Sequence, residues 1–222
     1  MLDSTVRDRW FYAAFSSALV ALIAAGFAPS FYARGWFATA GSLPALVQWH
    51  GIVATAWVLV FALQTTLVAQ SRLQWHRRVG VAGAALAGVF VALGTLVIVR
   101  FEQTHGAEAR NVLAAHAFTN GAPLAAFGVL VAAGIWQRRV AARHKRLMLL
   151  AAVVLMPPAI GRLFGALDLA RFNFPLYACF ALLHAAYDVF TRGRPHPISL
   201  VGGAALVALD VAATAWLAAV ES

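Results

Sequence analysis

QWHGIVATAWVLVFALQTTLVAQSRLQWHRRVG, residues 48–80, is an apolar stretch with a histidine near each end, His50 and His76. A helical path over the 26 steps between these histidines would span about 39 Å, more than the roughly 30 Å of a hydrocarbon layer. We therefore expect one histidine near each face of a membrane. Residues 115–151 repeat the arrangement, because His116 and His144 stand 28 residues apart and two basic residues again follow the second histidine.

The composition is that of an integral membrane protein. Of the 222 residues, 62% are hydrophobic and 11% are charged, and the mean hydropathy is +0.78. A soluble domain has roughly one-quarter charged residues. The net charge of +9 comes from basic residues in short loops between apolar stretches, where they set the topology, so we expect no nucleic-acid partner. The single cysteine, Cys179, excludes an intrachain disulfide and is expected to be a small buried hydrophobic residue.

Seven apolar stretches predict an all-α polytopic protein with seven transmembrane helices, which form a single membrane domain over residues 1–222. Two hairpins, 45–100 and 111–167, are expected to form a central four-helix bundle as a parallel repeat, with the other three helices at its periphery. The predicted helices are 10–28, 45–70, 79–100, 111–136, 146–167, 174–191 and 198–220.

The distribution of basic residues predicts the orientation. Twelve Lys and Arg residues lie in the amino-terminal segment and in the loops after the second, fourth and sixth helices, whereas four lie in the opposite loops. The positive-inside rule therefore predicts an amino terminus inside and a carboxyl terminus outside. In this frame His50 and His116 lie at matching depth near the outer face, and His76 and His144 lie at matching inner positions.

Paired histidines at one depth suit a six-coordinate b-type haem, because two neutral imidazoles from facing helices can bind the iron from both sides. We expect His50 and His116 to hold such a haem, and Arg162, in the outer half of its helix, to pair with a propionate. The alternative is two interfacial histidines that cap helices and are hydrogen-bonded to their neighbours. His76 and His144 are the inner candidates, although QWHRRVG and RHKRLM are also typical of a cytoplasmic loop.

The segments HRRVG and HKRLMLLAAVVLMPPAIGR carry a resemblance to known proteins. Together with the four histidines they resemble the two-haem, bis-histidine transmembrane b-type cytochromes of the ascorbate or quinol type. They are also similar to small bacterial polytopic membrane proteins of no assigned function. The resemblance covers roughly residues 45–167 and implies an outer haem on His50 and His116 and an inner haem on His76 and His144. Two departures are the helix-end positions of His76 and His144 and the three additional helices.

A second polar set is expected near the middle of the membrane, where ionisable residues are functional by default. His184 and Asp210 are predicted to lie level and to pair, as part of a proton relay or a quinone pocket. The alternative is a hydrogen bond that holds the sixth helix to the seventh. Pro157 and Pro158 should kink the fifth helix. The members of the midplane set are Asn120, His184, Asp188 and Asp210.

Three functional hypotheses remain after several classes are excluded. A retinal Schiff base needs a lysine inside the bundle, and the only lysine, Lys145, lies in a predicted loop. The metalloprotease, serine hydrolase and nucleotide-binding motifs HExxH, GxSxG and the phosphate loop are absent from the sequence. The leading hypothesis is a haem b electron-transfer protein or oxidoreductase of the bacterial cytoplasmic membrane, with a quinone or small redox donor or a larger membrane complex as partner. The alternatives are a structural or assembly subunit and a proton-coupled transporter that uses His184 and Asp210.

Overall fold

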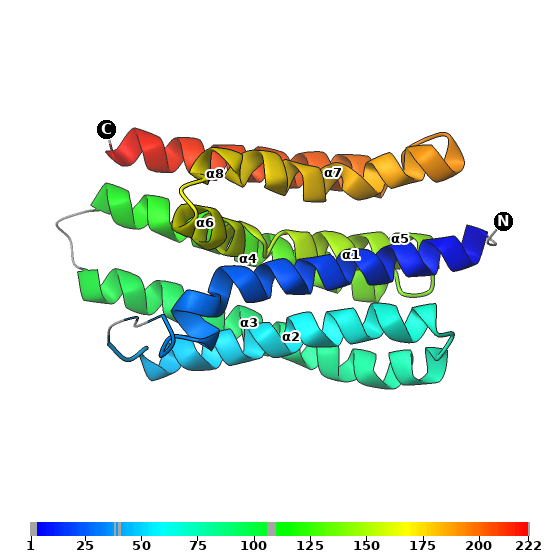
Figure 1. Cartoon of the computed structure of the whole chain (residues 1–222), viewed down its shortest axis with the longest axis horizontal. Coiled ribbons are helices and arrows are strands. Elements are labelled where there is room, and N and C mark those ends of the chain that lie inside the picture. Colours follow the sequence, from blue (N-terminus) through cyan, green and yellow to red (C-terminus); the bar gives the residue numbers. More distant parts are fainter. Residues whose placement is uncertain (1–3, 38, 40, 106–109, 222) are drawn as a thin grey trace. The chain divides into compact units, whose positions relative to one another are not determined.

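The computed structural model describes residues 4–37, 39, 41–105 and 110–221, and within them all regular structure is helical. The long helices are separated by short connections (Figure 1). In chain order the elements are α1 Ser4–Phe27, the π-helix η1 Ala28–Tyr32, α2 Ala45–Ala69, α3 Leu73–His105, α4 Arg110–Trp136, α5 Ala141–Val153, α6 Pro157–Ala166, the 3-10 helix η3 Ala170–Phe172, α7 Asn173–Arg192 and α8 Pro197–Glu221.

Seven segments of the described chain are long and apolar enough to cross a membrane, which confirms the all-α polytopic prediction. Six of the seven tryptophans are exposed and lie near span ends or in a connection, as expected for side chains that anchor helices in the membrane interface. Trp57 is the buried exception. The spans are Val6–Tyr32, Ala45–Ala69, Leu73–Phe101, Ala114–Trp136, Ala141–Ala166, Ala170–Arg192 and Pro197–Val220.

The chain forms two compact units, whose boundary passes through the middle of α3. We call Met1–Phe90 with Pro158–Asn173 the first unit, and Val91–Pro157 with Phe174–Ser222 the second unit. Each unit takes part of α3 and part of the fifth span.

Close approaches at glycine hold the first unit together. α1 lies alongside α2 (Figure 1), and the hydroxyls of Ser16 and Thr65 are hydrogen-bonded across this contact at 2.6 Å. A Cβ added to Gly26 of α1 would meet the backbone carbonyl of Ala159 in α6. Small residues let helix backbones approach in lipid, where dispersion and interhelical hydrogen bonds drive association.

The second unit is built around α5, whose residues Leu149–Val153 are fully buried. α4 and α8 both pack on α5 and on each other. Gly134 of α4 receives Met148 of α5, where a Cβ would come within 2.8 Å of the Met148 sulfur. Gly203 of α8 lies against the backbone of Ala181 in α7. The second half of α5 is buried on all sides and needs neighbours on every side, and Gly134 provides one such close contact.

The fifth span divides into two helices at the predicted proline pair. α5 ends at Val153 and α6 begins at Pro157, which suits the first helical position because its missing N–H is one of the unpaired donors there. The span begins at Ala141 rather than at the predicted residue 146, so Arg146 lies in the second turn of the helix and not at its first position. Cys179, expected to be buried, is exposed on α7.

Candidate functional site: the predicted histidines and a buried ionic cluster

His50, in the first unit, is the sixth residue of α2 and is half-buried. Its ring stacks on Phe90 of α3, with centroids 4.9 Å apart and planes inclined by 23°. Its Nδ1 is buried and has no hydrogen-bond partner among the described residues. A buried ring nitrogen without a partner is a candidate for a ligand that the chain itself does not supply.

His116, in the second unit, is also half-buried and stacks on Phe101 of α3 at a centroid distance of 4.1 Å. Asn120, one turn further along α4, is exposed and donates from its side-chain amide to the backbone oxygen of His116 at 2.8 Å. Asn120 therefore bonds within its own helix. Because His50 and His116 belong to different units, their predicted convergence on one haem stays a prediction.

The inner histidines lie in helices. His76 is the fourth residue of α3, and His144 is the fourth residue of α5. His144 lies within hydrogen-bond distance of the carbonyl of Gly134 near the end of α4, with 2.8 Å between Nδ1 and O. A carbonyl can only accept, so Nδ1 of His144 carries the proton and Nε2 is the basic nitrogen. His76 and His144 also fall in different units, so their pairing is likewise untested.

Arg162, the predicted propionate partner, lies on α6 in the first unit and is exposed. Its guanidinium donates to the backbone oxygen of Pro158 at 2.9 Å, one turn back in the same helix. The guanidinium carbon also lies 4.7 Å from the centroid of the Phe27 ring in α1, within the range of a cation–π contact. These contacts hold Arg162 within the first unit.

The most extensive polar site of the described chain is a buried ionic cluster in the second unit. Arg146 of α5 and Asp188 of α7 expose 0% and 1% of their surfaces. The Arg146 guanidinium donates to both carboxylate oxygens of Asp188, from Nε to Oδ2 at 3.0 Å and from Nη2 to Oδ1. This two-point contact is the strong geometry for an arginine and a carboxylate.

Three further groups complete the cluster around Asp188. The Ser199 hydroxyl of α8 donates to Oδ2 at 2.5 Å, and the His196 backbone N–H reaches the same oxygen at 3.3 Å. Arg192 donates to Oδ1 at 2.7 Å from the last residue of α7, with 38% of its side chain exposed. Asp188 thus accepts from α5, α7, α8 and the connection before α8. Two arginines face one carboxylate, so this set carries a net positive charge.

Local sequence explains how the cluster assembles. Arg146 lies on the same face of α5 as the buried Leu149, Leu150 and Val153, three, four and seven residues further along. α7 is followed by Gly193, whose φ of +72° favours glycine and whose N–H bonds back to the carbonyl of Val189. This turn brings Ser199, in the first turn of α8, beside the end of α7.

Sequence reasoning missed Arg146 and its contact with Asp188. The helical spacing of Arg146 to the buried leucines is the signal that could have identified it. Asp188 is four residues from the end of α7. Its i, i+4 spacing to Arg192 is the sequence signal for this end position.

His184 and Asp210, predicted to pair, have different surroundings. His184 is 1% exposed, and neither of its ring nitrogens has a hydrogen-bond partner in the described part of the chain. Asp210 is half-buried on α8, and Tyr177 lies seven residues before His184 on α7. Asp210 is 13 residues, about 20 Å, from the start of α8, whereas His184 is 8 residues, about 12 Å, from the end of α7. Asp210 is therefore level with Tyr177.

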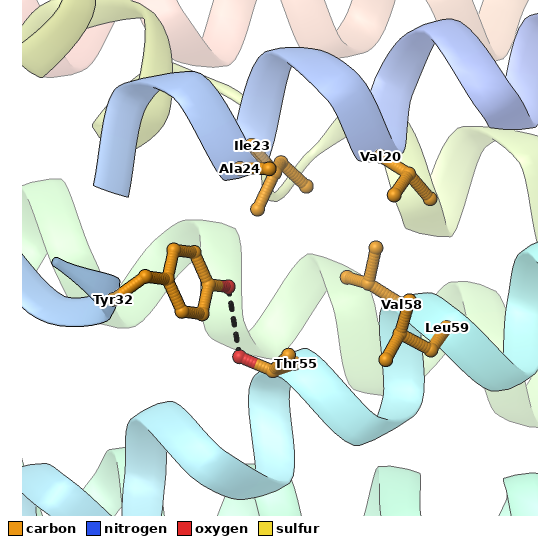
Figure 2. A pocket seen from close by; sticks show the side chains of 7 residues that line it. All are labelled: Val20, Ile23, Ala24, Tyr32, Thr55, Val58 and Leu59. Atoms are coloured by element: carbon orange, nitrogen blue, oxygen red, sulfur yellow. Dashed lines mark hydrogen bonds between the residues drawn. The ribbon is translucent and has the colours of Figure 1, made fainter. Parts of the chain in front are cut away.

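An apolar cavity of about 180 Å³ lies between α1 and α2 in the first unit (Figure 2). Val20, Ile23 and Ala24 of α1 face Val58 and Leu59 of α2 across it. At one end the Tyr32 hydroxyl is hydrogen-bonded to the Thr55 hydroxyl at 2.9 Å. None of the predicted site histidines lines this cavity, so it is separate from the haem prediction.

The described residues contain no group of three or more His, Cys, Asp or Glu side chains placed to hold a metal ion. A bis-histidine haem uses two such side chains, so this finding does not bear on it. Comparison with known proteins finds no matching family model, no similar curated protein and no similar solved structure.

Proposed function

We propose that this chain is a transmembrane electron-transfer protein that holds haem b between paired histidines, His50 with His116 and His76 with His144. The observation that carries the proposal is the contact of His144 with the Gly134 carbonyl at 2.8 Å. Histidines that bind a metal generally donate their other ring N–H to a carbonyl or carboxylate, which fixes the tautomer and orients the ring. The contact gives His144 the tautomer that an axial ligand needs.

The surroundings of His50 add support from the first unit. Stacking on Phe90 fixes the plane of the imidazole, and the buried Nδ1 has no partner in the described residues. A haem held by these histidines would supply one-electron transfer. Side chains of this chain would orient the imidazoles and keep water from the site. Arg162 remains the candidate partner for a propionate.

The electron donor and acceptor are proposed by chemical class. A quinone or a small redox donor would deliver electrons at one face, and a larger membrane complex is the alternative partner. The setting we propose is the bacterial cytoplasmic membrane, with the basic connections inside. The lipid bilayer is the environment that the seven apolar spans require.

The visible spectrum of the protein purified from haem-replete cells tests the proposal. We expect the reduced protein to show the bands of a low-spin b-type cytochrome. The variant His144→Ala should lose the inner haem, and His50→Ala or His116→Ala should lose the outer haem. The matched control is His105→Ala, at the end of α3, which should leave the spectrum unchanged.

A colourless protein from haem-replete cells would overturn the proposal and favour a structural or assembly subunit. Bands that survive in His144→Ala and His50→Ala but vanish in His184→Ala would move the haem to another histidine. Each variant should be compared at equal protein concentration after size-exclusion chromatography, so that loss of haem is separated from loss of folded protein.

A further inference from the structure

His184 is a buried, ionisable side chain that the proposed haem does not use. It is 1% exposed, and neither ring nitrogen has a hydrogen-bond partner among the residues described. A buried polar group without a partner costs about 1–3 kcal/mol. Ionisable residues inside membrane spans mark ion and proton pathways. An unsatisfied buried polar group in a native protein therefore calls for a functional explanation.

The face of α7 that carries His184 is buried and bears ionisable groups on both sides of it. Tyr177 and Asp188, seven residues before and four residues after His184, expose 2% and 1% of their surfaces. From Tyr177 to Asp188 the helix rises about 16 Å, which is half of the hydrocarbon layer. Ala181 and Ala185, the other buried residues of this face, are small and have no polar side-chain atoms.

The two ends of this face differ in charge. At the Arg192 end, Asp188 is held ionised by Arg146, Arg192 and Ser199, so it cannot itself exchange a proton readily. At the other end Asp210 of α8 is level with Tyr177, and no arginine or lysine of the described residues is paired with it. A half-buried carboxyl without a cation can accept a proton.

We propose that His184 carries protons through the second unit, between the Arg192 end of α7 and the Tyr177–Asp210 pair. One ring nitrogen of His184 forms a new N–H bond with a proton from a hydronium ion that enters beside Arg192 and leaves as neutral water. The other ring nitrogen then loses its proton, through water, to the carboxylate of Asp210. His184 returns to the neutral form, Asp210 gains an O–H bond and then gives up that proton to water at the opposite face, and no electron moves.

The charges around His184 set the conditions of this transfer. The charged and titratable groups around His184 are Asp188, one turn away on α7, Arg146 and Lys145 of α5, and His196 before α8. A charged imidazole in the interior is costly, so His184 holds the additional proton only in passing. The proposal is independent of haem, because each of these groups belongs to the chain.

Proton flux into liposomes tests this proposal. The purified protein is reconstituted with a pH-sensitive dye inside, and a potassium gradient with valinomycin drives proton entry. We expect the wild-type protein to admit protons above the rate of protein-free liposomes, and His184→Gln to abolish this excess. Asp210→Asn should reduce it, and the matched control His105→Gln should retain it.

A wild-type flux equal to that of protein-free liposomes, or an undiminished flux in His184→Gln, would overturn the proposal. If His184→Gln does not fold, ¹⁵N NMR of histidine in the wild-type protein replaces it. Ring signals of His184 that report exchange between its two neutral tautomers between pH 5 and 8 are expected, because a carrier gains and loses its proton on different ring nitrogens, and a single fixed tautomer throughout would exclude a carrier. A colourless protein with this flux would remove the haem proposal and leave the proton proposal intact.

Discussion

Asp188 and His184 lie one turn apart on the same buried face of α7, and each is 1% exposed. Asp188 accepts hydrogen bonds from Arg146, Arg192, Ser199 and the backbone of His196. His184 has no hydrogen-bond partner for either ring nitrogen in the described chain. Two equally buried polar side chains on one helix face therefore differ in whether their hydrogen-bonding atoms are satisfied. The Asp188 carboxylate is an anchor that joins α5, α7 and α8, whereas the His184 imidazole lies in the interior with neither ring nitrogen hydrogen-bonded to the described residues.

The largest expected effect comes from removing the anchor. Asp188→Leu leaves Arg146 buried without its carboxylate, and breaking a buried ion pair from one side costs about 3–5 kcal/mol. In a chain of this size we expect the melting temperature in detergent to fall by about 10 °C or more. Differential scanning fluorimetry of the purified variant measures the change.

The double variant Arg146→Met with Asp188→Leu is the matched control. It removes both buried charges, and apolar replacement of a whole buried pair is often neutral or stabilising. We therefore expect it to melt at a higher temperature than Asp188→Leu alone. A double variant that is no more stable would show that the loss arises from packing and not from an unpaired Arg146.

The next effect concerns the contact that brings Ser199 and Asp188 together. A Cβ at Gly203 of α8 would meet the Ala181 carbonyl of α7, so Gly203→Ala must separate the two helices. Overpacking of this kind costs about 1–3 kcal/mol. The control is Gly88→Ala on α3, where a Cβ meets nothing within 4 Å and helix propensity favours alanine. Equal melting temperatures for the two variants would contradict the close approach of α7 and α8.

His184→Leu can be compared directly with Asp188→Leu, because leucine replaces the buried polar side chain in both variants. Removing a buried imidazole that has no partner should stabilise the protein by about 1 kcal/mol, since an unsatisfied polar group is lost. We expect the melting temperature to rise by a few degrees while the proton flux disappears. A loss of stability as large as that of Asp188→Leu would show that His184 is bonded in the folded protein.

The sequence allowed prediction of the seven spans and of the interruption at Pro157, because hydropathy and proline act locally. It did not allow prediction of the ionic cluster. A charge at a helix end and a charge in a loop look alike under the positive-inside rule, and only the contact with Asp188 distinguishes Arg146. Counting residues from the span ends also set Asp210 level with His184. In the structure Asp210 lies about 20 Å from the start of α8 and His184 about 12 Å from the end of α7, so Asp210 is level with Tyr177 instead.

The predicted haem pairs depend on more than local sequence. Each pair joins residues of different units, and convergence of side chains from separate helices depends on tertiary packing that no local pattern encodes. What the structure adds is local: the tautomer of His144 and the ring stacking of His50. The first of these features supports the haem proposal in the second unit, and the other supports it in the first unit.

The smallest expected effect is a pH dependence of the melting temperature that arises from His196, at the edge of the ionic cluster. His196 lies between α7 and α8, where its Nδ1 accepts the backbone N–H of Ile198 at 3.2 Å and its own N–H reaches Asp188. Burial, followed by the charge of Arg146, lowers the pKa of His196 from its ordinary value of 6.5, against the opposing charge of Asp188. A proton on Nδ1 would also remove the bond from Ile198.

Because the pKa of His196 is lower in the folded state, the unfolded chain binds more protons between that pKa and 6.5. The stability contribution is therefore complete above pH 6.5 and declines as the pH falls toward the folded pKa. Melting temperatures in the His184→Leu background, where His184 cannot titrate, should decline less over this window when His196→Asn is added. Asparagine keeps an acceptor for Ile198 but carries no titrating proton. An equal or steeper decline with His196→Asn would mean that His196 gains as much from the Asp188 carboxylate as it loses by burial.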